Sequence, residues 1–421
     1  MGRDKDRHMT TLLVNIRQLL NVRSDTRPLR GAALSHMPFI EDAWLLVEDG
    51  EIAGFGPMSA MPDALGSHQG SVDVAQGLVL PAWCDSHTHL VFSGSRESEF
   101  VDKVRGLDYA EIARRGGGIL NSARRLNETS EDELFRQSWK RVEEVAAMGT
   151  GALEIKSGYG LCPEGELKML RVIRRIRQRS PLEVRATFLG AHAFPENFRD
   201  DRRGYIDQIV NDMIPVVAAE GLADFIDVFC EKGFFTVEES REICLAGMAH
   251  GLRPKIHANQ LHASGGVQLG AELGALSVDH LESMDDEAVG RLAASDTVGT
   301  MLPTAAFFLR MPFQPARRLI EAGCAVALAS DYNPGSSPSG NMNLVVSMAC
   351  ISMRMLPEEA IQAATLNGAC AMGLGDRLGS IALGKKANLI VTEPIPSFAS
   401  IPYLFGRHTV RGTIFGREVR V

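Results

Sequence analysis

The chain has 421 residues, of which 45% are hydrophobic and 23% are charged, and its formal net charge is −8. This length is too great for one small core and favours a large barrel-type domain with a smaller companion. The acidic balance argues against nucleic-acid binding, because a surface that follows phosphates would be basic. No apolar run is long enough to span a bilayer, and the charged N-terminus does not resemble a secretion signal, so we expect no membrane partner.

The seven cysteines are scattered and form no C-x-x-C pair. This usage fits reduced thiols better than a disulfide framework, and it predicts a cytoplasmic location. Residues 1–8 are expected to be a disordered lead or an added segment, with Met9 as a candidate start.

Short strands separated by turns are predicted over residues 11–75. Leu12–Ile16 and Ala43–Val47 have β character, and Asp49-Gly50 stands between alternating apolar residues. An Asp-Gly pair in that setting is a hairpin signal. We see no helix of any length in this region and expect a small β unit.

From about residue 78 the pattern changes to alternating strands and amphipathic helices. Helices are expected over 131–148, 165–179, 237–250 and 312–322. Eight strand–helix units favour a closed (β/α)₈ TIM-type barrel, in which active sites gather at the C-terminal ends of the strands. The eight candidate strands are Leu78–Cys84, Gly151–Lys156, Glu183–Gly190, Phe225–Cys230, Arg253–Ala258, Leu276–His280, Val298–Pro303 and Ala325–Ser330.

After the barrel the sequence returns to β character over 379–381, 387–391 and 410–419. These strands most simply complete the unit that begins at the N-terminus. The prediction is therefore a discontinuous small β-sandwich domain formed by residues 9–77 and 374–421, and a barrel domain formed by residues 78–373.

Histidine and aspartate side chains recur where the barrel strands end. His87 and His89 follow strand one and share a face, because residues two apart in an extended segment point the same way. Core histidines would not gather on one rim, so this pattern predicts a metal site. The other members are His192 after strand three, His257 in strand five, His280 in strand six and Asp331 after strand eight.

The expected ligands are His87, His89, His257 and Asp331, with zinc or iron as the cofactor and one position left open for water. A metal held in this way lowers the pKa of its water from about 15.7 to about 7. Asp331 could take the water proton and return it to a leaving nitrogen, and His280 could stabilise an oxyanion or relay a proton. Which of the two is the working base is left open.

With these residues the sequence resembles the amidohydrolase superfamily over nearly its whole length. The HxH pair, His257, His280 and Asp331 carry the resemblance, and so does the closing stretch 363–369 followed by 379–381 and 384–389. The resemblance implies a metal-dependent hydrolase built on a barrel.

Within the superfamily, five segments together resemble the imidazolonepropionases of histidine breakdown: 114–119, 154–161, 190–193, 227–231 and 330–336. That resemblance implies hydrolysis of the ring C–N bond of a small molecule, 4-imidazolone-5-propanoate, to N-formimidoyl-L-glutamate. An arginine suits this substrate, since a guanidinium can hold a propanoate group bidentately. The residues implied to bind substrate are Arg96, Tyr159, His192, Asn333, Gly335 and Ser336.

Other features are discounted or limited. Lys156 falls on strand two rather than strand four, so it is not read as the carbamylated lysine of two-metal relatives. Gln260 stands where some relatives carry Glu. An amide cannot act as a base, so Gln260 is expected to contribute to catalysis and substrate binding only by positioning the water or the ring. Cys230 lacks a partner base, and residues 116–118 lack the context of a phosphate loop.

Three alternatives remain beside this interpretation. A deaminase of a cyclic amidine would share the metal site and release ammonia. An interaction protein would have lost metal ligands, and none is missing here. A carbohydrate or phosphate enzyme would need paired carboxylates or a phosphate loop. A homodimer is expected from the resemblance.

Overall fold

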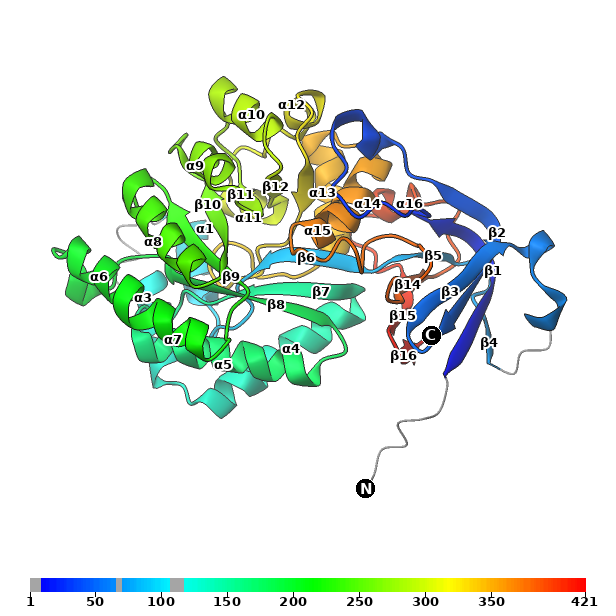
Figure 1. Cartoon of the computed structure of the whole chain (residues 1–421), viewed down its shortest axis with the longest axis horizontal. Helices are drawn as coiled ribbons and strands as arrows, with labels where there is room; N and C mark the ends of the chain where they lie inside the picture. The colour runs from blue at the N-terminus through cyan, green and yellow to red at the C-terminus, as the bar shows by residue number, and fades with distance from the viewer. Residues whose placement is uncertain (1–8, 66–69, 107–116) are drawn as a thin grey trace.

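The computed structural model describes residues 9–65, 70–106 and 117–421, and it contains two sheets that are joined by the chain at residue 82 (Figure 1). The expectation for residues 1–8 and the part of the predicted 114–119 segment up to residue 116 lie outside the described residues. Within the described part of the chain, no helix is long and apolar enough to cross a membrane.

One sheet is a barrel of eight parallel strands that neighbour one another in chain order. Nearly every residue of these strands is buried, as expected for a parallel sheet that helices cover on the outside. The predicted (β/α)₈ fold is confirmed. Its strands are β6 (Trp83–Thr88), β7 (Thr150–Lys156), β8 (Glu183–Ala191), β9 (Phe225–Cys230), β10 (Arg253–Ala258), β11 (Ser277–His280), β12 (Val298–Met301) and β13 (Val326–Leu328).

The barrel closes between β6 and the residues that follow β13. Asp331 N donates to His87 O at 3.0 Å, and His89 N donates to Tyr332 O at 2.9 Å. Asp331 has a positive φ of 53°, so the chain leaves the extended conformation at the point where it meets β6. Closure therefore places the HxH residues beside Asp331.

Helices surround the barrel, and two of them begin at residue types that commonly cap helices. Ser130 caps α4, and Thr236 and Glu239 form a capping box at the start of α8. The predicted 312–322 helix is shorter, because α12 begins only after Pro315. The helices between and after the strands are α1 (Glu97–Val104), α3 (Ile119–Glu128), α4 (Glu131–Ala147), α5 (Pro163–Arg179), α6 (Arg202–Gln208), the π-helical turn η5 (Ile209–Met213), α7 (Ile214–Ala219), α8 (Val237–Ala249), α9 (Gly266–Leu273), α10 (Asp286–Ala293), α11 (Pro303–Leu309), α12 (Ala316–Glu321), α13 (Met342–Met353), α14 (Pro357–Ala364) and α15 (Leu366–Cys370).

The second sheet combines strands from both termini, as predicted: the blue β1 and β2 lie on the same side of the molecule as the red β14–β16 (Figure 1). Its strands follow one hydrogen-bonded path, β16-β15-β14-β5-β1-β2-β3, with β4 paired to β1, rather than two separate sheets. The strands are β1 (Thr10–Leu20), β2 (Phe39–Glu48), β3 (Glu51–Pro57), β4 (Ser71–Asp73), β5 (Leu78–Pro81), β14 (Asn388–Thr392), β15 (Val410–Phe415) and β16 (Glu418–Arg420).

Short helical pieces complete this part: η1 (Gly31–Ser35), η2 (Met58–Ala60), η3 (Asp63–Leu65) and α16 (Ser400–Tyr403). The predicted hairpin is confirmed between β2 and β3. Asp49 and Gly50 both have positive φ, 51° and 88°, which is the conformation of a type I′ turn.

The prediction that Leu78–Cys84 forms one barrel strand is wrong. Residues 78–81 form β5 and pair with β1 and β14 in the second sheet, and the barrel strand β6 begins at Trp83. Both pieces are apolar and buried, so hydrophobicity alone could not separate them. His87 therefore lies within the strand, and only His89 follows it. Strand pairing assigns residues 78–81 to the second sheet, whereas the predicted domain limits assign them to the barrel. The other predicted domain limits stay predictions.

The predicted ends of strands seven and eight also shift. β12 stops at Met301, because Pro303 begins α11, where its missing N–H is tolerated at the first turn. β13 spans only Val326–Leu328.

Candidate metal centre and substrate cavity

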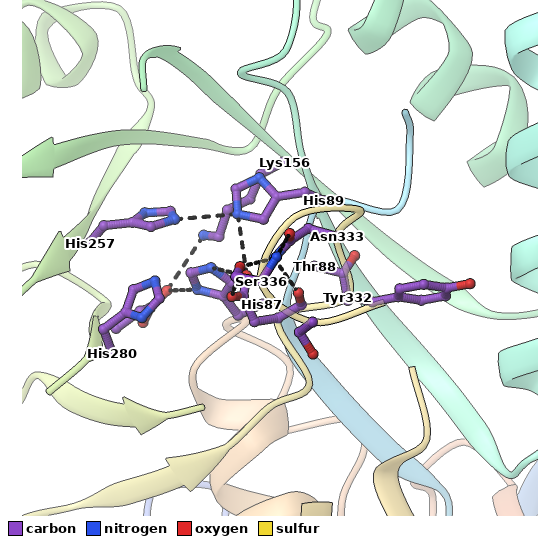
Figure 2. Close-up of polar contacts among 12 residues, drawn as sticks. His87, Thr88, His89, Lys156, His257, His280, Tyr332, Asn333 and Ser336 are labelled. Atoms are coloured by element: carbon purple, nitrogen blue, oxygen red, sulfur yellow. Dashed lines mark hydrogen bonds and ion pairs between the residues drawn. The ribbon is translucent and has the colours of Figure 1, made fainter. Parts of the chain in front are cut away.

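Four of the predicted site residues converge at the C-terminal end of the barrel. His89 Nε2 lies 3.3 Å from His257 Nε2, and Asp331 Oδ1 lies 3.5 Å from His87 Nε2 and 3.7 Å from His89 Nε2. Figure 2 shows the labelled histidine rings turned toward one another. Nitrogens and a carboxylate oxygen from three separated strands thus meet in one buried space.

The outer nitrogens of two of these rings fix the direction in which the inner nitrogens point. His87 Nδ1 lies 2.7 Å from Asp279 Oδ2, and His257 Nδ1 lies 2.9 Å from Asp227 Oδ2. His87 Nδ1 is hydrogen-bonded to its carboxylate, and His257 Nδ1 lies within ion-pair distance of its own. A proton on each Nδ1 leaves the Nε2 lone pair toward the centre, the arrangement found for metal-binding histidines. His87 Nε2 is buried without a hydrogen-bond partner.

This donor set fits a transition metal. The ligand atoms of His87, His89 and Asp331 all lie within 4.8 Å of one another, and so do those of His87, His257 and His280. Imidazole nitrogens with one carboxylate suit zinc or iron better than calcium or magnesium, which prefer oxygen.

A buried ion network lies beneath these residues. Lys156 Nζ is 2.5 Å from Glu154, 2.8 Å from Asp227 and 3.5 Å from Asp279, and Lys255 also pairs with Glu154. All five side chains are fully buried. The two carboxylates that contact His87 and His257 therefore share the ammonium group of Lys156, and Lys255 Nζ also lies 3.9 Å from Asp279. Lys156 thus pairs with three carboxylates of the network.

Sequence reasoning missed the role of Asp227 and Asp279. The available signal was the presence of charged residues inside otherwise apolar strands, at positions 154, 156, 227 and 255. Buried charges must be paired, so such residues on neighbouring strands predict a network.

His280 and Asp331 occupy strained backbone within the candidate metal centre, with φ of 91° and 53°. Such conformations persist where the surrounding fold imposes them, often at functional sites. Burial lowers the pKa of His280, but the carboxylates of Glu282, Asp331 and Asp279 outweigh it and the pKa is raised. Burial raises the pKa of Asp331, against the opposing effect of His280 and His257.

A cavity of about 580 Å³ opens next to this centre. Burial lowers the pKa of His192 to about 3, and its Nδ1 lies 2.9 Å from Gly158 O, so the ring is neutral with Nε2 able to accept a hydrogen bond. His192 also stacks on His89, with ring centroids 5.2 Å apart. The structure brings together all the residues that the resemblance assigned to substrate: Arg96, Tyr159, His192, Gln260, Asn333, Gly335 and Ser336 line the cavity.

Asn333 organises the loop after β13. Its Oδ1 accepts from Gly335 N and Ser336 N, both at 2.8 Å, and its Nδ2 donates to Asp331 O at 2.7 Å. Ser336 Oγ donates to Asp331 Oδ2 at 3.2 Å. The amide of Asn333 is thus largely engaged within the loop, where it holds Asp331 in place.

Replacing Gly335 by alanine is expected to weaken substrate binding. A Cβ at this position would lie 2.4 Å from Arg96 Nη1, and φ of Gly335 is outside the left-handed region, so the guanidinium and not the backbone must move. We expect KM to rise about tenfold, the effect of losing one charge-assisted contact. Steady-state kinetics test this. Gly290→Ala, in open space on α10, is the control, and an unchanged KM in Gly335→Ala would contradict the geometry.

A second carboxylate fixes the loop that carries Tyr159. Glu166, buried on α5, accepts from the backbone N–H groups of Gly158, Gly160 and Leu161 at 2.7–2.9 Å. Tyr159 is 4% exposed, and burial raises the pKa of its hydroxyl, which therefore stays protonated and able to donate. No sequence pattern predicted this loop contact.

Glu166→Ala is expected to lower the free energy of unfolding by roughly 3 kcal/mol, because it leaves three buried N–H donors without a partner. It should also raise KM by loosening Tyr159. Denaturant titration and kinetics measure the two effects. Glu164→Ala, an exposed change in the first turn of the same helix, should alter neither; equal behaviour of both variants would exclude a role of Glu166 in fixing the loop.

Comparison with known proteins agrees with this site. The model of the amidohydrolase family matches residues 223–417. A curated imidazolonepropionase from Flavobacterium johnsoniae is 52% identical over 412 residues, covering 98% of this chain and 100% of the relative. The chain belongs to the imidazolonepropionase family. One from Geobacillus thermodenitrificans is 44% identical over 96% of both chains. The chain is thus a hydrolase of the class that acts on a cyclic C–N bond.

Solved structures share the fold at low identity. Escherichia coli guanine deaminase matches with a TM-score of 0.71 and 15% identity, over 99% of both chains. A 5-methylcytosine deaminase from Klebsiella pneumoniae matches with a TM-score of 0.71 and 16% identity, over 98% of both chains. These neighbours show the amidohydrolase barrel with its small β domain and carry no argument about substrate.

Proposed function

We propose that this member of the imidazolonepropionase family hydrolyses the ring C–N bond of 4-imidazolone-5-propanoate and yields N-formimidoyl-L-glutamate. The observation that carries the proposal is the position of Arg96 in the same cavity as His192, which stacks on His89 of the candidate metal centre. A cavity that has a guanidinium in its wall and lies beside the candidate metal centre suits a small ring that bears a carboxylate.

His87, His89, His257 and Asp331 are the proposed ligands of one zinc or iron ion. When bound, such an ion acts as a Lewis acid that polarises a carbonyl and lowers the pKa of water. The supporting observations are the inward Nε2 lone pairs, the unpartnered His87 Nε2 and the short distances among the four side chains.

The remaining steps fall to the protein's own side chains. Arg96 binds the propanoate, while Tyr159 and neutral His192 orient the ring through hydrogen bonds. Asp331 accepts the proton of the attacking water and delivers it to the leaving ring nitrogen. His280, whose pKa is raised, carries the positive charge that stabilises the developing oxyanion. Gln260 positions the ring or the water and takes no proton.

The test is the fall in absorbance of 4-imidazolone-5-propanoate on addition of enzyme, with the product identified by mass spectrometry and ammonia assayed in parallel. We expect N-formimidoyl-L-glutamate without ammonia, and about one metal ion per chain by elemental analysis. Release of ammonia would favour the deaminase alternative. Full turnover by metal-free protein would overturn the metal-dependent mechanism.

We also propose a cytoplasmic location and a homodimer. All seven cysteines are free and five are buried, which suits a reducing compartment. Light scattering at several protein concentrations tests the dimer, and a concentration-independent monomer mass would contradict it.

A further inference from the structure

Three charged residues share one face along helix α1, and two of them line the substrate cavity. Arg96 directly precedes the helix, and Glu99 and Lys103 follow at spacings of three and four, which places them on one face. Arg96 and Lys103 both line the cavity. Lys103 belongs to none of the motifs discussed above.

The two cations meet at Gly335. Lys103 Nζ donates to Gly335 O at 3.3 Å, and Arg96 Nη1 lies 2.4 Å from the position that a Cβ on Gly335 would take. An ammonium group has three donors, so one contact with a carbonyl leaves Lys103 free to bind a further acceptor. A single acceptor beside Gly335 could therefore bond to both side chains.

Glu99 forms an ion pair with only one of these cations, Arg96. Its Oε2 accepts from Arg96 Nε at 2.9 Å and Nη2 at 2.5 Å, which leaves Nη1 toward the cavity, and its Oε1 accepts from Gly118 N at 3.1 Å. Within the described residues, no carboxylate lies within ion-pair distance of Lys103. This face of α1 thus places two cations at the cavity, while Glu99 lies behind Arg96 and is not among the lining residues.

We propose that Lys103 is a second carboxylate-binding residue, which together with Arg96 holds the propanoate group of the substrate beside Gly335. The inference rests on the proposed function, because it identifies the anion as that of the imidazolone ring's side chain. Lys103 is partly buried, and burial and the neighbouring Arg96 lower its pKa against the opposing effect of Glu99. An anion beside Lys103 and Arg96 would offset both the burial of the ammonium group and the repulsion between the two cations. Two cations would also make the enzyme select the carboxylate over a neutral side chain.

The competing explanation is that Lys103 only fastens α1 to the 333–336 loop through Gly335 O. A structural tie of that kind would affect charged and neutral ligands equally. The experiment therefore compares 4-imidazolone-5-propanoate with its propanamide analogue, using the metal-loaded full chain and the variants Lys103→Met and Lys103→Arg. Lys140→Met, an exposed lysine on α4, is the matched control.

We expect Lys103→Met to raise KM for the propanoate about tenfold, with kcat changed by less than about threefold, and to leave the propanamide almost unaffected. Lys103→Arg should restore most of the preference for the propanoate, and Lys140→Met should match the wild type. Equal losses for both substrates, or no loss for either, would overturn the proposal.

Binding of the product keeps the test independent of turnover. Calorimetric titration with N-formimidoyl-L-glutamate and with N-formimidoyl-L-glutamine, its γ-amide, should show a preference for the acid that falls about tenfold in Lys103→Met. If the wild type binds neither compound and opens no imidazolone ring, the proposed function fails. If it does both and Lys103→Met keeps the full preference, only the role of Lys103 fails.

Discussion

Replacing His257 by alanine is expected to remove the bound metal and the ring-opening activity together. His257 Nε2 lies 3.3 Å from His89 Nε2, and its Nδ1 is held by Asp227, so the side chain is fixed at the centre of the donor set. Loss of a supporting residue around a metal typically costs about 10–100-fold in affinity or activity, and loss of a ligand should cost more. Elemental analysis and the absorbance assay measure both quantities on the same sample.

His250→Ala is the matched control, since that histidine is exposed at the end of α8 and precedes β10, whereas His257 lies near the C-terminal end of that strand. It should bind one metal ion and turn over substrate at the wild-type rate. A His257→Ala protein that retains full metal content and activity would remove His257 from the proposed ligands.

The second large effect is expected from Lys156→Met. This change leaves the buried carboxylates of Asp227 and Asp279 without their shared cation, and breaking a buried ion pair in this way typically costs about 3–5 kcal/mol. The free energy of unfolding of the metal-free protein, measured in urea, should fall by that amount. Metal affinity should also fall by about 10–100-fold, because both carboxylates orient candidate ligands.

The charge-matched double variant Lys156→Met with Glu154→Gln separates charge from packing. It removes one positive and one negative group from the same network, so part of the lost stability should return. If Lys156→Met unfolds at the same urea concentration as the wild type, the network contributes nothing to the fold.

The sequence predicted the barrel and most of its strands because alternating apolar strands and amphipathic helices are local patterns. It also predicted that histidines and aspartates would gather on one rim, since topology alone brings strand ends together. The division of residues 78–88 between two sheets was not predictable, because both pieces are apolar and buried and only pairing distinguishes them.

The supporting contacts depend on register between strands that are distant in the chain. Asp227 reaches His257 through the alignment of β9 with β10, and Asp279 on β11 reaches His87 on β6 because the sheet is closed into a barrel. No local pattern encodes these contacts. Glu166 contacts the Tyr159 loop through the geometry of the helix start, and Lys103 reaches Gly335 through the packing of α1 on a loop far along the chain. Such contacts follow from the assembled fold.

The seam where the barrel closes has a further consequence. Ser330 N donates to Asp85 Oδ1 at 3.0 Å across 245 residues of sequence, and His87 and Asp331 stand on the two sides of that junction. An ion bound by both side chains would cross-link the first strand of the barrel, β6, to the segment that follows its last strand, β13. Binding of the metal would then stabilise the closed barrel. The free energy of unfolding would rise by RT ln(1 + [L]/Kd), where [L] is the concentration of free metal and Kd its dissociation constant.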